Sequence, residues 1–198
     1  LICLIAIIIS FAFQELILTQ EVYYSLYGSQ MERYRIDDVI QLTEKLEIWG
    51  YLATPIFIWI RLVFVSFLIQ LPFMLRYIEI PFNEVFRITA FAFFILLSAD
   101  LIRFLYLYFF PKESITSEIL NFTPLALTNL LDKNSYSQIA ITFLSKINVF
   151  EVIWGVVIYK GLNRTGKVDK IDALLVVFGV WLFIIVLLIT LKLIQQTL

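Results

Sequence analysis

Five long apolar segments dominate the pattern of hydrophobic and polar residues along the chain. A helix that crosses a bilayer needs about 20 largely apolar residues, because the hydrocarbon core is about 30 Å thick and a helix rises about 1.5 Å per residue. The segments that meet or nearly meet this length are residues 1–18, 49–71, 85–110, 139–159 and 173–193. We therefore expect an all-α fold, a polytopic transmembrane bundle of about five spanning helices that forms one domain over residues 1–198.

Two connecting segments have a mixed character. Residues 19–48 are polar overall, but side chains compatible with a helix face recur at Ile36, Val39, Ile40, Thr43 and Leu46. This spacing indicates either an amphipathic helix on the membrane surface or a short solvated helix packed on other loops. Residues 115–131 are too polar to span and too apolar to lie free, so we expect an interfacial or re-entrant segment that breaks at Pro124.

The composition supports a membrane protein. Hydrophobic residues make up 61% of the chain and charged residues 16%, with a mean hydropathy of +0.91. Soluble domains are usually about 45–50% apolar and about 25% charged. A chain of 198 residues leaves much of its surface exposed, so an apolar excess of this size is expected to face lipid.

Several classes of function are disfavoured by what the chain lacks. It contains no histidine and one cysteine, Cys3, which removes an intrachain disulfide, a zinc cluster and the commonest general base. The net charge is −1 and no basic face is visible, so nucleic acid is not an expected partner. An intramembrane protease would need a Ser/His pair, paired Asp residues or a zinc motif. We expect no enzymatic activity, no cofactor and no metal.

One short loop carries the densest basic cluster and sets the expected orientation. Its residues are Lys160, Arg164, Lys167 and Lys170. The positive-inside rule places such a loop in the cytoplasm. Five spans then put the N-terminus inside, and put the C-terminus and both mixed segments outside, which suits a multi-pass protein of a bacterial inner membrane.

The same loop imitates a phosphate-binding motif. The segment Gly161-Leu-Asn-Arg-Thr-Gly166-Lys167 has the G-x-x-x-x-G-K spacing, but Val168 follows where a Ser or Thr hydroxyl would bind magnesium. The motif also requires a preceding strand, whereas this segment follows an apolar helix. We therefore expect the two glycines to end the fourth helix and turn the chain.

Charged residues inside the apolar segments are the most informative candidates for function. They are Arg61, Asp100, Arg103, Lys146 and Glu151. Charges at such depths are costly, so they face the bundle interior or water and usually pair. Antiparallel helices would bring Arg61, Asp100 and Glu151 to a similar depth. This layer is either a structural ion-pair network or a path for an ion or substrate. The structural role is favoured, because transporters more often have helices broken at mid-membrane.

Three motifs resemble the Yip (Ypt-interacting-protein) domain family of five-span membrane proteins. The segment Phe122-Thr-Pro-Leu-Ala-Leu-Thr-Asn-Leu-Leu131 is similar to the stretch before the fourth span in bacterial members. Ile147-Asn-Val-Phe-Glu-Val-Ile-Trp154 is similar to the start of that span, and Gly161-Leu162 follows it. The resemblance covers residues 50–195 approximately, whereas residues 19–48 depart from it. It implies a cytoplasmic N-terminus, an external C-terminus and no catalytic residues.

The expected function is that of a non-enzymatic accessory subunit in a larger membrane assembly, with an ABC-type exporter as the favoured assembly. The resemblance supports this expectation, because some bacterial relatives accompany exporters, whereas eukaryotic relatives act in vesicle traffic with small GTPases. The expected partners are the lipid bilayer and other membrane subunits. The alternatives are a small transporter or channel that uses the Arg61/Asp100/Glu151 layer, and an adaptor in membrane trafficking or shaping.

Overall fold

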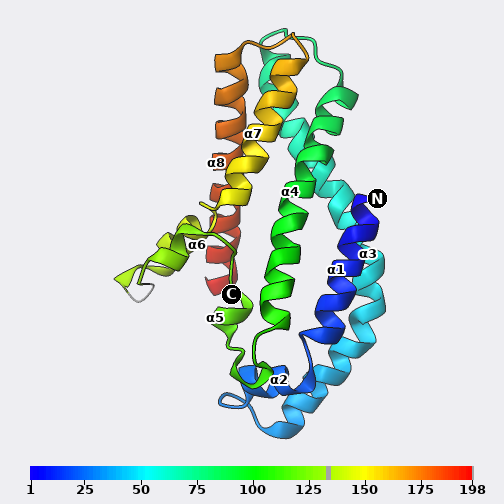
Figure 1. The fold of residues 1–198 in the computed structure, drawn as a ribbon, viewed down its shortest axis with the longest axis vertical. Helices are drawn as coiled ribbons and strands as arrows, with labels where there is room; N and C mark the ends of the chain where they lie inside the picture. The colour runs from blue at the N-terminus through cyan, green and yellow to red at the C-terminus, as the bar shows by residue number, and fades with distance from the viewer. Residues whose placement is uncertain (133–134, 198) are drawn as a thin grey trace. The chain divides into compact units, whose positions relative to one another are not determined.

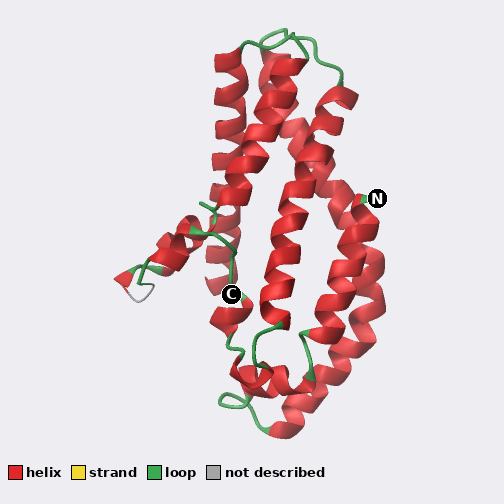
Figure 2. Cartoon of the chain, in the orientation of Figure 1, coloured by secondary structure: helices red, strands yellow, loops and turns green. Residues whose placement is uncertain are grey.

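A computed structural model describes residues 1–132 and 135–197, and all regular structure in these ranges is helical (Figures 1 and 2). The helices are α1 (Ile2–Leu16), α2 (Gln20–Tyr27), α3 (Arg33–Leu75), α4 (Phe82–Tyr108), η1 (Lys112–Ser114), α5 (Ser117–Leu120), η2 (Leu127–Leu130), α6 (Gln138–Ser145), α7 (Val149–Arg164) and α8 (Lys170–Thr197). The prediction of an all-α fold is confirmed for the described ranges.

Three helices are long and apolar enough to cross a membrane in the part of the chain that is described. They are α3, α4 and α8, the last over Lys170–Ile194. A fourth span is possible in α1 and α2, which together pass the same test but are bent by 73°. The length and apolar composition of these helices support the prediction of a membrane protein, whereas the predicted number of five spans is not confirmed.

The predicted span over residues 139–159 is corrected by the structure, which divides it into α6 and α7. Asn148 lies between the two helices, and its side chain accepts a hydrogen bond of 2.9 Å from the backbone N–H of Glu151. The backbone of Ile147 accepts a second hydrogen bond, also of 2.9 Å, from Leu127. The Asn148 side chain caps α7, and the Ile147 carbonyl pairs with the loop that contains Leu127. These two hydrogen bonds interrupt the helix although the segment is continuously apolar.

The second half of the mixed segment before the second span is also corrected, because residues 33–48 are not a separate helix. Residues 20–27 form the separate helix α2, whereas residues 33–48 continue without interruption into residues 49–71 and form the 43-residue helix α3 with them. At about 1.5 Å per residue this helix is about 65 Å long, roughly twice the hydrocarbon thickness. The helix face predicted for residues 36–46 is packed only in its first part, since Ile36 and Ile40 are buried whereas Leu46 is 54% exposed.

The second mixed segment contains α5 and η2, with Pro124 between them. Ile115, Ala126 and Thr128 are buried, so this segment is packed rather than free. Ala126 also forms an isolated antiparallel bridge with Asn148. The bridge joins the two longest motifs of the family resemblance, since one motif contains Ala126 and the other contains Asn148. The interfacial location of the segment stays a prediction.

The described chain divides into two compact units. Unit 1 comprises Leu1–Ile60 and Leu97–Pro124, and unit 2 comprises Arg61–Leu96 and Leu125–Leu198. In unit 1, Ile17, Val22, Leu107 and Ile115 form one buried cluster.

Unit 2 has the larger core. On α7, buried side chains recur every four residues at Phe150, Trp154, Ile158 and Leu162. The last three join residues of α3, α4 and α8 in one cluster. This periodicity fixes which face of α7 turns inward.

Gly161 lies within α7 rather than at its end, which corrects the role expected from its sequence. A Cβ atom added at this position would lie 2.5 Å from Cγ2 of Ile88 on α4. The glycine therefore permits close approach of the two helices within unit 2. The turn itself is made by Gly166, whose φ of +70° is a conformation that glycine adopts without strain.

Candidate functional site

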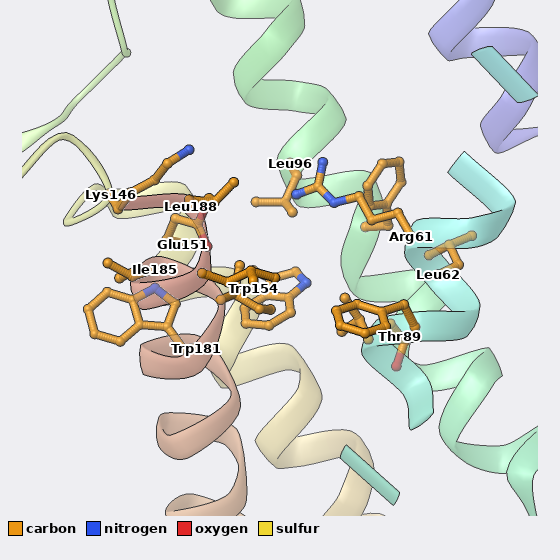
Figure 3. A pocket seen from close by; sticks show the side chains of 15 residues that line it. Arg61, Leu62, Thr89, Leu96, Lys146, Glu151, Trp154, Trp181, Ile185 and Leu188 are labelled. Atoms are coloured by element: carbon orange, nitrogen blue, oxygen red, sulfur yellow. The ribbon is translucent and has the colours of Figure 1, made fainter. Parts of the chain in front are cut away.

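A cavity of 370 Å³ within unit 2 brings together three of the charged residues singled out in the sequence (Figure 3). Arg61 enters from α3, whereas Lys146 and Glu151 come from the α6–α7 junction. The remaining lining is largely apolar and includes Phe93, Leu96, Trp154, Trp181 and Ile185. The volume lies within the range of about 300–1,000 Å³ that is usual for small-molecule sites.

Arg61 approaches the cavity from one side and stacks on an aromatic ring. Its guanidinium carbon lies 5.1 Å from the centroid of Phe93 on α4. This cation–π contact stabilises the positive charge without neutralising it. Figure 3 shows Lys146 and Glu151 on the opposite side, with Trp154 between them and Arg61.

Lys146 and Glu151 are positioned by the break between α6 and α7. Lys146 is the C-terminal cap residue of α6, and Glu151 occupies the first turn of α7. Asn148 holds the start of that turn through its hydrogen bond to the backbone of Glu151. The interruption of the predicted fourth span therefore places a cation and a carboxylate at the same cavity.

The three charged groups do not form a closed ion pair. Among the described residues, ion pairs within 4.0 Å include Arg76–Asp172 and Lys167–Glu84, the latter at 3.7 Å, but no such pair joins Arg61 or Lys146 to Glu151. The cavity carries two cations and one carboxylate, a net charge of +1 from these three side chains. The indole N–H groups of Trp154 and Trp181 are additional donors. This set of groups can hold an anion.

Asp100 and Arg103, the other two charged candidates, belong to unit 1. They line a separate cavity of 340 Å³ together with Ser10, Phe13 and Gln14, among others. Arg103 donates a hydrogen bond of 2.5 Å to the carbonyl of Leu120 and lies 5.4 Å from the Phe13 ring centroid. The structure thus groups Arg61 with Lys146 and Glu151, and groups Asp100 with Arg103.

The predicted basic loop is exposed throughout at its charged positions. Lys160 and Arg164 lie in the last turns of α7, Lys167 follows Gly166, and Lys170 begins α8. Ion pairs connect this end of unit 2 to the residue that follows α3 and to the first turn of α4. Lys167 contacts Glu84 at 3.7 Å, and Arg76 contacts Asp172.

The roles of three residues that shape the cavity were not foreseen in the sequence analysis. Trp154 and Trp181 line it, and Asn148 positions Glu151. For Asn148 a signal was present, since Asn followed three residues later by Glu before an apolar run is typical of a helix N-terminus. The tryptophans carried no such signal, because aromatic residues in an apolar segment face lipid or core equally well.

No group of three or more His, Cys, Asp or Glu side chains that could hold a metal occurs in the described ranges. No family model, curated protein or solved structure matches the chain. The resemblance to the Yip domain family therefore stays a prediction that rests on the three sequence motifs.

Proposed function

We propose that this chain is a non-enzymatic, multi-pass membrane protein that admits a small anion into the cavity lined by Arg61, Lys146 and Glu151. Its activity would be that of a small transporter or channel, the alternative in the sequence analysis. The observation that carries this proposal is the presence of two cations and one carboxylate around one cavity, with no direct ion pair among them.

The energetic argument starts from the depth of the cavity along the helices. The cavity lies near the middle of each long helix that lines it. Arg61 is near the middle of the apolar part of α3, Leu96 near the middle of α4, and Trp181 near the middle of the span in α8. A charged residue at such a position costs about 2.5–3.5 kcal/mol on translocon scales. A structural network would offset this cost by closing into ion pairs, whereas separated charges around a cavity are solvated by water or by a ligand.

The sign of the charge selects the ligand class. Arg61 and Lys146 supply cationic donors on different sides, and Glu151 is the one carboxylate among the described residues that line the cavity. A monovalent anion between the two cations balances the net charge of the three groups. Glu151 then limits how strongly the anion is held, which is a requirement for release.

A flux measurement tests this function. The purified protein is reconstituted in liposomes loaded with chloride, and iodide entry is followed with an ion-selective electrode. We expect entry above that of empty liposomes, and a loss of most of this excess in the Arg61→Gln/Lys146→Gln variant. Lys170→Gln removes a cation outside the cavity and should leave entry unchanged. Equal entry in all variants, or none in the wild type, contradicts the proposal.

A second function, that of an accessory subunit in a larger membrane assembly such as an ABC-type exporter, is favoured by an apolar stripe on α3. Leu42, Leu46, Trp49 and Ile56 are all more than half exposed and follow a 4-3-7 spacing. This is the spacing of a heptad seam. Leu42 and Leu46 belong to the charged part of α3, beside Glu44 and Lys45, where lipid is not expected to cover them.

Isolation of partners tests this second function. The wild type is purified in mild detergent and the co-purifying proteins are identified and quantified. A stoichiometric partner that is lost in a Leu42→Ser/Leu46→Ser variant supports the subunit role. The control is Arg33→Ser, at an exposed position of the same helix. Ile36 is buried, so a serine there would disturb packing and could not serve as the control. Purification of the wild type without any such partner argues against it.

We also propose that the loop with Lys160, Arg164, Lys167 and Lys170 faces the cytoplasm, with the protein in a bacterial inner membrane. The support is the density of exposed cations at this end of unit 2. The positive-inside rule depends on such clusters in short loops.

A further inference from the structure

A second hollow in unit 2 is an apolar groove between α7 and α8, which pack against each other (Figure 1). We call it the α7–α8 groove. Its walls include Val152 and Val156 on α7 and Leu174 and Phe178 on α8, all of which are exposed. Its volume of 560 Å³ is within the range of ligand sites.

The floor of the groove depends on a glycine. Gly155 lines it, and a Cβ atom added there would lie 3.5 Å from Cγ1 of Val177 on α8. This distance is an ordinary van der Waals contact, so helix packing alone does not require glycine at this position. The missing side chain instead leaves space in the groove.

The two ends of the groove differ in charge. Lys160 and Tyr159 line one end, and Glu151 lines the other. The nine helical steps from Glu151 to Lys160 correspond to about 14 Å of helix, which is close to half of the hydrocarbon thickness of about 30 Å. The groove therefore matches the depth of a single leaflet, with its cation at the end nearest the exposed basic loop.

We infer that the α7–α8 groove binds an anionic phospholipid, with one acyl chain along the apolar walls and the phosphate at Lys160. Arg164, one helical turn further along α7, and Lys167 extend the positive surface beside the headgroup. Basic side chains at the end of a crevice between membrane helices attract anionic headgroups in this way. The phenol of Tyr159 suits the same boundary, because one end of the ring is apolar and the other polar.

The length of the groove favours a lipid over a helix of another protein. A spanning helix would contact its partner through both leaflets, whereas this groove ends at Glu151. Glu151 and Trp181 line both the groove and the charged cavity, but the inference does not depend on anion passage, because it rests on Lys160, Gly155 and Phe178, which line the groove alone.

A lipid-binding experiment on the purified full chain tests the headgroup. Phosphatidylglycerol and phosphatidylcholine of the same acyl chains are added in detergent, and bound lipid is counted by native mass spectrometry. We expect phosphatidylglycerol to bind preferentially and to raise the apparent Tm, with about a fivefold loss of affinity in Lys160→Gln. Lys170→Gln, with an exposed cation outside the groove, should retain more of the affinity. Equal binding of both lipids by the wild type overturns the inference.

A second pair of variants tests the acyl-chain site. Gly155→Leu fills the floor of the groove, whereas Gly179→Leu adds the same side chain where nothing lies within 4 Å of an added Cβ. We expect the first to abolish the phosphatidylglycerol preference and the second to retain it. If Gly155→Leu does not fold, the Lys160→Gln comparison still decides. Lipid binding is contradicted if inorganic phosphate alone raises the apparent Tm as much as phosphatidylglycerol does. It is also contradicted if a co-purifying protein occupies the groove in place of lipid.

Discussion

Replacement of Gly161 by alanine tests the helix packing on which unit 2 is built. An added Cβ would lie 2.5 Å from Cγ2, 3.0 Å from Cγ1 and 3.3 Å from Cβ of Ile88. Carbon atoms pack best at about 3.5–4.0 Å, so α7 and α4 would have to separate locally by about 1 Å. Ile88 cannot simply rotate away, because its branched Cβ is itself one of the close atoms and its χ1 is stiff in a helix.

The magnitude follows from two opposing effects. Overpacking of this kind costs about 1–3 kcal/mol. Alanine in place of glycine within a helix returns about 1 kcal/mol through its higher helix propensity. We therefore expect Gly161→Ala to lower the stability by up to about 2 kcal/mol. Gly179→Ala, where nothing lies within 4 Å of the new Cβ, should keep the propensity gain and be neutral or stabilising.

The assay is the apparent Tm of the purified protein in one detergent, measured at one scan rate because membrane proteins often unfold irreversibly. We expect the order Gly179→Ala, wild type, Gly161→Ala from the most to the least stable. Ile88→Ala combined with Gly161→Ala should cost less than the sum of the single changes, because the colliding atoms are absent. A Gly161→Ala protein as stable as Gly179→Ala would refute close approach at this point.

Three further predictions concern the cavity and the topology. Arg61→Leu should destabilise the protein by about 1–3 kcal/mol, since Glu151 loses a nearby cation. The double variant Arg61→Leu/Glu151→Gln should recover much of this loss, and a double variant less stable than Arg61→Leu would contradict an interaction between the two charges. Asn148→Ala should lower the apparent Tm by the equivalent of about 1 kcal/mol through loss of the α7 cap, and an unchanged Tm would show that the cap is unimportant. In a Cys3→Ala background, Ser29→Cys should react with an impermeant maleimide from outside whereas Thr165→Cys should not, and the reverse labelling pattern would reverse the orientation.

The class of fold could be predicted from the sequence because it depends on summed hydropathy. The apolar segments of α3, α4 and α8 are long enough to dominate any local effect. The helical periodicity at Ile36 and Ile40 was equally readable, since both are buried. The continuation of this helix into the next apolar segment was not predicted. The hydropathy changes from polar to apolar near residue 48, whereas the helical backbone continues through that position.

The break between α6 and α7 shows what hydropathy misses. Asn148 caps the start of α7, so α6 ends before it. The backbone N–H of Leu127 donates a hydrogen bond to the Ile147 carbonyl at the same break. Both effects depend on hydrogen bonds, and the second joins residues that are distant in sequence. The same limit applies to the charged layer. Depth along the helices predicted that Arg61, Asp100 and Glu151 would lie in one layer, but it could not show that Asp100 belongs to unit 1 and lines a different cavity.

Collisional quenching of tryptophan fluorescence tests the anion cavity most directly. Trp49 and Trp59 are 69% and 57% exposed, so a Trp49→Phe/Trp59→Phe variant leaves the two tryptophans that line the cavity as reporters. In liposomes, we expect iodide to quench this variant more strongly than caesium. The preference should fall when Arg61→Gln and Lys146→Gln are added, and it should persist with Lys170→Gln. Equal quenching by the two ions, or an iodide preference that survives loss of both cavity cations, would contradict an anion site between Arg61 and Lys146.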